Sequence, residues 1–233
     1  MNVVITGATR GIGRALTEKF AAEGSNLAVC ARTAADLRSL EKDLKDRYPD
    51  CELLALPCDV GEKKQIKKFA SEVLRHLKAV DVLINNAGLF LPGQLHKERE
   101  GIFEQLMRVN VYGPYYLTRL LCKSMIRQRR GHIFNICSTA SIQAYPNGGS
   151  YSVSKFALLG MTRNLRLELA AFNIKVTAVI PGATLTSSWE GSPHPAQRFM
   201  KAQDVAQAVW NAYVLSNQTV VEEIVLRPLE GDL

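Results

Sequence analysis

The fold of this chain is decided by the stretch Val3-Val4-Ile5-Thr6-Gly7-Ala8-Thr9-Arg10-Gly11-Ile12-Gly13. A short β-branched run, residues 2–6, passes directly into a glycine-rich turn, and apolar residues then recur at helical spacing to about Glu23. In this context a glycine-rich turn can bind phosphate, because the N-terminus of a helix presents free backbone N–H groups to an anion. We therefore predict a dinucleotide site at this turn.

The three glycines have different tasks in the predicted turn. Gly7 allows the sharp reversal after the strand, whereas Gly11 and Gly13 let the backbone approach a pyrophosphate and let the helix pack on the strand. Their spacing is GxxxGxG, not GxGxxG. Since ordinary helix N-termini also use glycine, the prediction depends on the strand before the turn and the helix after it.

The rest of the chain alternates strands and helices. Apolar runs predict strands at 27–31, 51–57, 80–85, 132–137, 174–180 and 220–226. Helical spacing predicts helices at about 35–48, 61–77, 101–128, 150–172 and 202–215. Short, almost wholly apolar strands that alternate with amphipathic helices indicate a parallel sheet covered on both faces. We predict an α/β fold, a single Rossmann-type doubly wound domain over 1–233 with about seven parallel strands.

One long irregular stretch is expected, at about 183–201. It contains Trp189, Phe199 and two prolines. Because loops of this length in a compact domain are often lids, we predict a short substrate lid here.

Composition excludes several classes of protein. The 233 residues are 47% hydrophobic and 22% charged, as in an ordinary globular chain. No apolar stretch approaches the about 18 residues needed to span a membrane, and the N-terminal residues do not resemble a signal peptide. The five cysteines form no CxxC pair, which is typical of reduced thiols and not of a disulfide framework or a metal site. We expect a cytoplasmic protein without membrane contacts.

The net charge is +7, from 29 Lys and Arg against 22 Asp and Glu. The basic residues are spread along predicted helices, and nothing resembles a helix-turn-helix, a zinc finger or an RNA-binding strand with aromatic residues. We expect solvated helix faces and no nucleic-acid partner.

The end of the second strand indicates which dinucleotide binds. NAD sites usually place an acid there for the ribose 2′-hydroxyl, whereas an arginine suits the 2′-phosphate of NADP. Here the strand ends in Ala31-Arg32, with no acid, and Arg10 lies within the glycine-rich turn. Since a guanidinium pairs strongly with phosphate, the sequence favours NADP(H).

Tyr151 and Lys155 are four residues apart, so on a helix they lie on one face. A nearby ammonium favours the phenolate and lowers the pKa of the tyrosine, which could then exchange a proton with a substrate oxygen near neutral pH. Ser138, at the end of the fifth strand, could bond the same oxygen. Alone, a YxxxK spacing is a weak signal, because it occurs often by chance.

A rival interpretation uses the same helix. Residues 152–155 match SxxK, a motif of serine acyl-enzymes, but the SDN and KTG elements of those enzymes do not occur, and neither does GxSxG. The four histidines have no ligand spacing. Hydrolase and metal chemistry are therefore rejected.

Together these residues resemble the short-chain dehydrogenase/reductase family over essentially the whole chain. The resemblance rests on the glycine-rich turn, Asn85-Asn86-Ala87-Gly88 after the fourth strand, and Ser138, Tyr151 and Lys155 in order. It also includes Asp59 after the third strand, Asn110 in a long helix, and Pro181-Gly182 followed by Thr186.

The resemblance implies hydride transfer between a nicotinamide and a carbonyl or alcohol carbon. It implies that Tyr151 is the acid or base, that Ser138 orients the carbonyl, that Lys155 holds the nicotinamide ribose and tunes Tyr151, and that Asn110 holds a water that links Lys155 to solvent. The implied cofactor residues are Gly7, Thr9, Arg10, Gly11, Ile12, Gly13, Arg32, Asp59, Val60, Asn86, Ala87, Gly88, Tyr151, Lys155, Pro181, Gly182, Thr184 and Thr186. Asp59 and Val60 would line the adenine, residues 86–88 the adenine-side ribose, and Thr186 the carboxamide or pyrophosphate.

Within the family, residues 219–228 and 186–189 look similar to bacterial sepiapterin-reductase-like members. We therefore expect a sepiapterin-like or small carbonyl substrate. Carbonyl-reductase and 3-oxoacyl-carrier-protein-reductase-like members share much of this pattern, so 3-oxoacyl-carrier-protein reductase-like activity is an alternative. A third alternative is a non-catalytic NADP-binding regulator, against which the four catalytic residue types argue. By analogy with the family, we expect a homodimer or homotetramer built on the helices that carry Asn110 and Tyr151.

Overall fold

The predicted strands form one parallel sheet in the computed structural model, which describes residues 1–189 and 191–232 apart from the side chain of Ser188. The seven strands lie in the order β3-β2-β1-β4-β5-β6-β7, and each neighbouring pair is parallel. Their bounds are β1 Asn2–Thr6, β2 Asn26–Ala31, β3 Leu53–Pro57, β4 Val82–Asn85, β5 Gly131–Ile136, β6 Ile174–Pro181 and β7 Glu223–Leu226. The predicted doubly wound fold with seven strands is confirmed.

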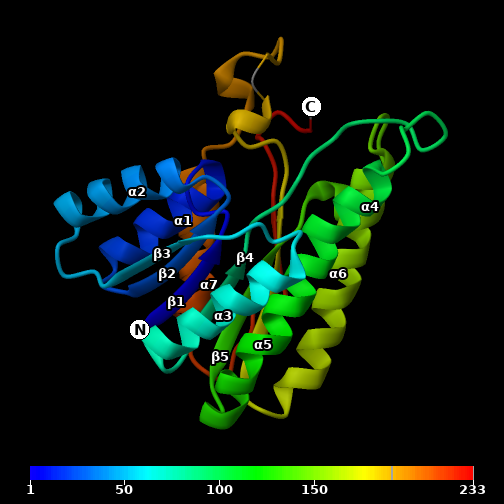
Figure 1. The fold of residues 1–233 in the computed structure, drawn as a ribbon. Coiled ribbons are helices and arrows are strands. Elements are labelled where there is room, and N and C mark those ends of the chain that lie inside the picture. The colour runs from blue at the N-terminus through cyan, green and yellow to red at the C-terminus, as the bar shows by residue number, and fades with distance from the viewer. Residues whose placement is uncertain (190, 233) are drawn as a thin grey trace.

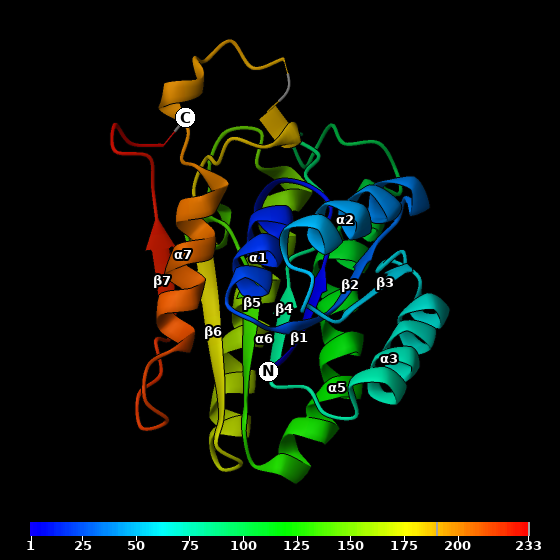
Figure 2. The same ribbon diagram turned by 90° about the vertical axis from the view of Figure 1, so that its left-hand side faces the viewer.

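Helices cover both faces of the sheet (Figures 1 and 2). On one face lie α1 (Gly11–Ala22), α2 (Ala34–Arg47) and α7 (Ala202–Tyr213), and on the other lie α3 (Lys63–Leu77), α5 (Gly113–Gln128) and α6 (Gly149–Ala170). Each helix buries the apolar stripe that its spacing predicts, as Leu16 and Phe20 of α1 do against Val205 of α7. The two apolar layers enclose the sheet, which explains why the central strands are almost wholly apolar.

The structure corrects two predictions, one about the helix at 101–128 and one about the number of long irregular segments. The helix predicted at 101–128 begins as α4 (Ile102–Met107), passes through a π-helical turn, Arg108–Tyr112, and continues as α5. A second long irregular stretch, residues 86–101, joins β4 to α4, so the expectation of only one such stretch is wrong. Its backbone bonds to distant segments instead of forming a regular element, as where the N–H of Gly93 donates to the carbonyl of Asn147 at 2.9 Å.

The predicted lid, residues 183–201, contains two single turns of 3-10 helix, Ser187–Trp189 and Ala196–Arg198. A bridge between Thr184 and Met200 joins the two ends of this segment. In Figure 1 the segment stands above the carboxyl ends of the strands, beside the C-terminal residues.

The order of the strands places a crevice beyond the carboxyl ends of β1 and β4, in the middle of the sheet. Chain connections leave β1 and β4 toward opposite faces, and these strands are neighbours, with Val3 opposite Val82 in the register. In open α/β sheets ligands bind beyond the carboxyl ends of the strands at such a switch point.

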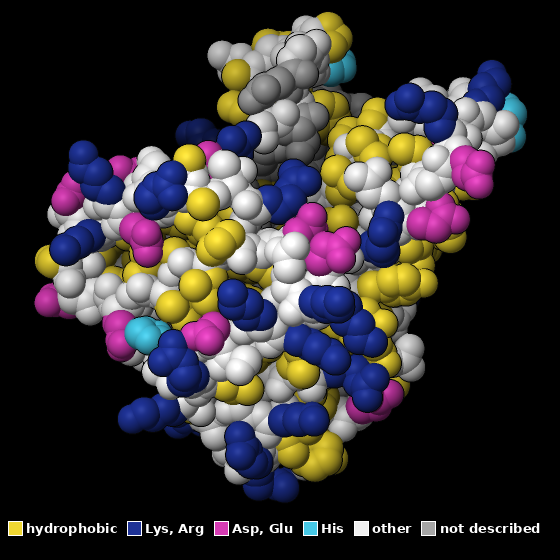
Figure 3. Space-filling view, in the orientation of Figure 1, with side chains coloured by type: hydrophobic (Ala, Val, Ile, Leu, Met, Phe, Trp, Pro, Cys, Tyr) yellow, Lys and Arg dark blue, Asp and Glu magenta, His cyan; other side chains and the backbone are white. Residues whose placement is uncertain are grey.

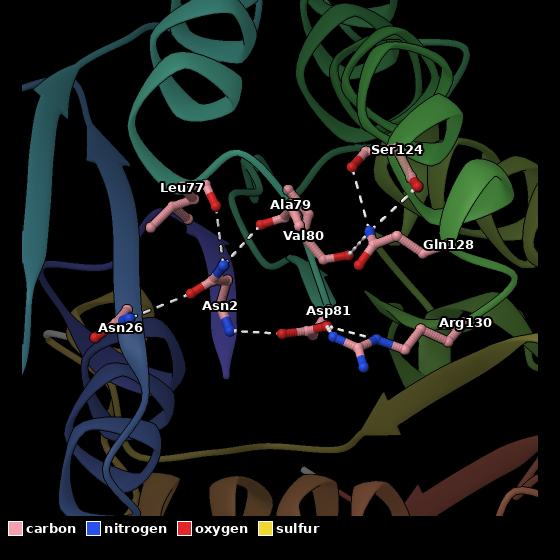
Figure 4. Close-up of polar contacts among 9 residues, drawn as sticks. All are labelled: Asn2, Asn26, Leu77, Ala79, Val80, Asp81, Ser124, Gln128 and Arg130. Carbon is pink, nitrogen blue, oxygen red and sulfur yellow. Dashed lines mark hydrogen bonds and ion pairs between the residues drawn. The ribbon is translucent and has the colours of Figure 1, made fainter.

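A polar network at the opposite end fixes the register of β1 and β4 (Figure 4). The amide of Asn2 donates to the carbonyls of Leu77 and Ala79, each at 3.0 Å, and its backbone N–H donates to Asp81 Oδ2 at 2.9 Å. Arg130, just before β5, forms an ion pair with Asp81 at 2.9 Å. The chain entering β4 and β5 is thereby tied to the first residue of β1, which sets where these strands end at the crevice.

Eight of the 29 Lys and Arg residues lie on α3 and α5, and Lys and Arg side chains gather on the face shown in Figure 3. One of them, Lys63, stacks over the ring of Tyr116 with 4.3 Å between the ammonium and the ring centroid. Among residues 1–189 and 191–232, no helix has both the length and the apolar character that crossing a bilayer requires.

His132 on β5 gives the fold a pH dependence. Its Nε2 lies 2.7 Å from the hydroxyl of Thr177, and burial lowers its pKa to about 3 from an ordinary 6.5. Because the folded-state pKa lies below the unfolded-state value, the unfolded chain takes up this proton first. We expect full stability from this group above pH 6.5, and a loss of about 1.4 kcal/mol of unfolding free energy per pH unit between pH 6.5 and about 3, where the folded state takes up the proton as well.

Urea unfolding at pH 7 and pH 5 measures this loss. His132→Phe should remove this part of the pH dependence, whereas the control His194→Phe, at an exposed site, should retain it. Equal pH dependence in both variants would contradict the assignment.

Candidate active site

A cavity of about 660 Å³ opens at the carboxyl ends of the strands. Every residue predicted for the site lines it except Asn110. The lining runs from Gly7 in the glycine-rich turn, past Tyr151 and Lys155 on α6, to Thr186 after β6. Residues more than 170 positions apart in the chain therefore meet in one space.

The glycine-rich turn is packed too closely for side chains. Gly7 has a φ of 67°, and its N–H donates to the carbonyl of Cys30 at 2.8 Å. A Cβ on Gly13 would lie 2.0 Å from the carbonyl oxygen of Gly7, and one on Gly11 would lie 2.7 Å from Thr186 Cγ2. These contacts bring the backbone of the turn, instead of side chains, to the floor of the cavity.

Asn86 has a structural task that sequence reasoning missed. Its side-chain amide donates to the carbonyls of Thr6 at 2.9 Å and Gly7 at 3.1 Å. The Thr6 hydroxyl in turn accepts from the backbone N–H groups of Asn86 and Ala87. The chain after β4 thus holds the turn after β1 in place, in addition to lining the cavity.

The rim of the cavity near α1 suits phosphate groups. Arg10, the residue that caps α1, makes no side-chain hydrogen bond to the helix within the described residues, and the first-turn residues 11–13 line the cavity. Uncapped N–H groups at a helix start favour an anion. Arg32 lines the cavity, is exposed, and forms no ion pair with any residue in the described part of the chain. Helix terminus and guanidinium groups together fit a phosphorylated dinucleotide.

Asp36 was not predicted. It lies in the first turn of α2 and forms an ion pair with Arg10 at 2.9 Å. No local pattern reveals it, because its partner Arg10 lies in the glycine-rich turn, 26 residues away in the chain. Of the two predicted arginines, Arg10 therefore has a carboxylate partner already.

Three predicted catalytic side chains come together at the inner end of the cavity. Tyr151 is half-buried, and its phenol hydrogen-bonds the Ser138 hydroxyl. Lys155 is 5% exposed; its ammonium lies 5.8 Å from the centroid of the Tyr151 ring and donates to the carbonyl of Ile136 at 2.9 Å. The spacing of four on α6 puts both side chains on the face toward the carboxyl end of β5, where Ile136 and Ser138 lie.

The pKa of Tyr151 corrects an expectation. Burial raises the pKa of this phenol above its ordinary value, and the hydrogen bond with Ser138 only opposes that rise. Burial lowers the pKa of Lys155 to about 8. Among the protein's own groups, burial dominates the pKa of Tyr151, and the lowering expected from Lys155 is not found.

Asn110 lies behind the cavity, in the π-helical turn. Its Oδ1 accepts from the N–H of Leu89 at 2.8 Å, and its amide donates to the carbonyl of Leu89 at 3.0 Å and to Ser154 Oγ at 2.9 Å. A Cβ on Gly88 would be 3.5 Å from Asn110 Oδ1 and 3.6 Å from Lys155 Nζ. π-Turns are frequent at functional sites, and here the turn aims an amide at the helix that carries Lys155.

An aromatic cluster covers the inner end. The ring of Phe90 meets that of Tyr151 edge-on at 4.8 Å, Trp189 lies 6.4 Å from Phe90, and Phe199 lies 5.1 Å from Trp189. Phe90 and Leu89 were missed because they lie in irregular chain, although they directly follow Asn85-Asn86-Ala87-Gly88. Gln143, Tyr145 and Asp232 also line the cavity and were not predicted.

This geometry can support chemistry on an oxygen. A phenol and a hydroxyl that already share a hydrogen bond can both reach a carbonyl or alcohol oxygen, and the phenol can exchange a proton with it. The glycine floor, the α1 N-terminus and the arginines fit the phosphates of a dinucleotide at the outer end.

Comparison with known proteins agrees with this geometry. The family model for short chain dehydrogenase matches residues 1–196. A sepiapterin reductase from Chlorobaculum tepidum is 34% identical over 99% of this chain and 97% of that protein. A 3-oxoacyl-(acyl-carrier-protein) reductase from Thermotoga maritima is 33% identical over 88% of this chain and 87% of that one. A metagenomic short-chain oxidoreductase crystallised with NADP is 31% identical, with a TM-score of 0.85 over 98% of this chain and 96% of that one.

Proposed function

The chain belongs to the short-chain dehydrogenase/reductase family and is an NAD(P)-dependent oxidoreductase, and from that premise we propose that it reduces a carbonyl to an alcohol, or the reverse, with NADP(H). The observation that carries the proposal is the hydrogen-bonded pair of Tyr151 and Ser138, with Lys155 beside it, at the inner end of a cavity whose outer end fits phosphate groups.

In the proposed mechanism Ser138 and Tyr151 hold the substrate oxygen. When bound, the nicotinamide supplies hydride to the carbonyl carbon or accepts it from the alcohol. Tyr151 gives its phenolic proton to the oxygen in reduction and takes it back in oxidation. Lys155 would hold the nicotinamide ribose, and with the cofactor bound its positive charge would favour the phenolate. Asn110, bonded to Leu89 and Ser154 behind Lys155, would hold a water that links Lys155 to solvent and so returns the proton.

We propose that the cofactor lies along the whole cavity. Gly7, Gly11 and Gly13 bring backbone to the pyrophosphate, together with Thr9 and Ile12. Asp59 and Val60 line the adenine, and Ala87 and Gly88 line the adenine-side ribose. Residues Pro181, Gly182, Thr184 and Thr186, after β6, contact the nicotinamide half. All of these residues line the cavity, which supports the assignment.

Arg32→Glu should separate NADP from NAD. We expect the Kd for NADPH to rise about 10- to 100-fold and the Kd for NADH to change less than about twofold, since a carboxylate repels the 2′-phosphate that Arg32 would bind. Binding measured by titration with each reduced cofactor checks this.

Arg38→Glu is the matched control, because Arg38 is exposed on α2 and does not line the cavity. It makes the same change of charge and should leave the Kd values for NADPH and NADH unchanged. An equal rise for NADH and NADPH in Arg32→Glu would contradict the 2′-phosphate role.

The aromatic cluster favours a flat or apolar substrate. Phe90 and Trp189 line the cavity beside Tyr151, and Phe199 is buried against Trp189. Aromatic rings stack well on a pterin or another conjugated ring. The similarity to a sepiapterin reductase supports a sepiapterin-like dicarbonyl, and the similarity to a 3-oxoacyl reductase supports a 3-oxoacyl thioester as the alternative.

A substrate panel tests the function. NADPH oxidation should be measured with sepiapterin, a small diketone, a steroid ketone and an acetoacetyl thioester. We expect turnover with at least one, and highest kcat/KM with sepiapterin or the diketone. No carbonyl-dependent loss of NADPH with any member would refute the proposed activity, and highest kcat/KM with the thioester would favour the alternative.

We also propose a cytoplasmic homodimer or homotetramer. Large apolar side chains are exposed on α5 and α6, among them Tyr115, Phe156 and Leu167, the last of which is 77% exposed. The five cysteines are free thiols. Light scattering on the purified protein distinguishes dimer, tetramer and monomer.

A further inference from the structure

The carboxylate of Glu98 reaches from the irregular segment 86–101 to the first turn of α6. The backbone N–H of Ser150 donates to Glu98 Oε1 at 2.9 Å, and the Ser150 hydroxyl donates to Glu98 Oε2. Glu98 is half-buried, whereas its charged neighbours Lys97, Arg99 and Glu100 are exposed. A single acid of this segment is thus withdrawn from solvent and bonded to a helix 52 residues away.

Two glycines make the space that this carboxylate occupies. A Cβ on Gly93 would lie 2.9 Å from Glu98 Cγ, and a Cβ on Gly149 would lie 2.0 Å from Glu98 Oε1. Gly149 has a φ of 43°, in the left-handed region that favours glycine. The seat of the carboxylate is therefore built from both the segment and the helix.

The contact also satisfies the helix. The cap residue of α6, Gly148, has no side chain to bond the first-turn N–H groups, and the described first turn contains no acid. A carboxylate supplied from elsewhere accepts such an N–H and is favoured by the positive end of the helix dipole. Glu98 supplies in space the cap that the local sequence of α6 does not.

The same segment and the same helix meet again at the reacting group. Ser150 directly precedes Tyr151, and Phe90 of the segment packs edge-on against the Tyr151 ring at 4.8 Å. The N–H of Gly93 donates to the carbonyl of Asn147 at 2.9 Å, just before the helix. Segment 86–101 is therefore hydrogen-bonded to the chain just before Tyr151 and also packed against the Tyr151 ring.

We propose that Glu98 is a positioning residue that clamps segment 86–101 to the first turn of α6 and so holds Phe90 and Tyr151 in register at the substrate end of the cavity. The inference rests on the proposed function for its catalytic consequence. Glu98 touches neither substrate nor cofactor in this arrangement, since it does not line the cavity. Its loss should therefore slow turnover while leaving cofactor binding in place.

The test compares Glu98→Ala and Glu98→Gln with the control Glu100→Ala in the full chain. Hydrogen–deuterium exchange of the first turn of α6 reads the clamp without turnover. Kinetics with the best carbonyl of the panel and NADPH titration read its consequence. Gln retains one acceptor oxygen without the charge, so it should partly rescue the loss and stays informative if Glu98→Ala does not fold.

In Glu98→Ala we expect the backbone amide hydrogen of Ser150 to exchange with solvent about tenfold faster than in wild type, and kcat to fall about tenfold. The Kd for NADPH should stay within about twofold of the wild-type value. Glu98→Gln should lie between, and Glu100→Ala should match wild type. Ser150→Ala combined with Glu98→Ala should lose less than the sum of the two single losses, because both remove one contact.

Three outcomes would overturn the proposal: unchanged Ser150 exchange in Glu98→Ala, a kcat equal to that of Glu100→Ala despite faster exchange, or additive losses in the double variant. A wild-type protein that reduces no carbonyl would refute the proposed function instead. The clamp would then be supported by faster exchange in Glu98→Ala and overturned by unchanged exchange.

Discussion

Tyr151→Phe is expected to lower kcat by about 10²–10⁴-fold, the range that a positioned acid or base contributes. The substitution removes one oxygen and keeps the ring that packs against Phe90, so the inner end of the cavity should retain its shape. Because the cofactor's phosphates would bind at the other end, near Gly13 and Arg32, the Kd for NADPH should change by less than about threefold. Steady-state kinetics and NADPH titration on one preparation measure both.

Tyr145→Phe is the matched control, because Tyr145 lines the same cavity and carries the same hydroxyl. Its kcat should stay within about threefold of wild type, as expected for a group outside the proton transfer. If Tyr151→Phe and Tyr145→Phe had similar kcat values, or if Tyr151→Phe lost NADPH binding, Tyr151 would not be the acid or base.

Gly13→Ala is expected to damage both the fold and cofactor binding. The added Cβ would lie 2.0 Å from the Gly7 carbonyl oxygen and 2.3 Å from the amide nitrogen of Asn86, so the turn must open. Forcing a methyl group into such a packed site typically costs about 1–3 kcal/mol of unfolding free energy. An opened turn also withdraws backbone N–H groups from the pyrophosphate, so we expect the NADPH Kd to rise at least about tenfold.

Gly160→Ala makes the same chemical change where there is room. Gly160 lies inside α6, and a Cβ there meets nothing described within 4 Å. This variant should gain about 0.5–1 kcal/mol, because alanine loses less conformational freedom in a helix than glycine does. Chemical unfolding of both variants gives the comparison; a Gly13→Ala protein as stable as wild type would show that the turn can relax around a side chain.

Most of the fold could be predicted because its signals are local. The run Val3-Val4-Ile5, the glycines after it and the helical spacing after Gly11 lie within one short stretch, and the same alternation recurs along the chain. Apolar periodicity reports which residues are buried, and continuous apolar strands report burial on both faces, so sheet type and helix positions followed. The boundaries of the elements were predicted less accurately: β7 begins at Glu223 instead of at the predicted residue 220.

The residues of the candidate site also divide into those that local sequence patterns predict and those that they do not. Residues near strand ends were predictable, since the carboxyl edges of parallel strands converge in space whatever the loops do. The spacing of four predicted that Tyr151 and Lys155 share one helix face, and the resemblance to the family distinguished this pair from a chance YxxxK. Asp36, Phe90 and Glu98 were not, because each takes its partner from another element: Arg10, Tyr151 and Ser150 respectively.

The sequence by itself determined the doubly wound sheet, the glycine-rich turn and the types of group available for proton transfer, because these depend on spacing within single elements. Only the tertiary structure decided the directions in which the pKa values of Tyr151 and Lys155 shift, and the contact between Glu98 and Ser150. Burial, which raises the pKa of Tyr151 and lowers that of Lys155, is a property of all the elements that pack around these groups. The contact of Glu98 with Ser150 closes a loop of 52 residues, and no local pattern specifies a contact made across such a distance.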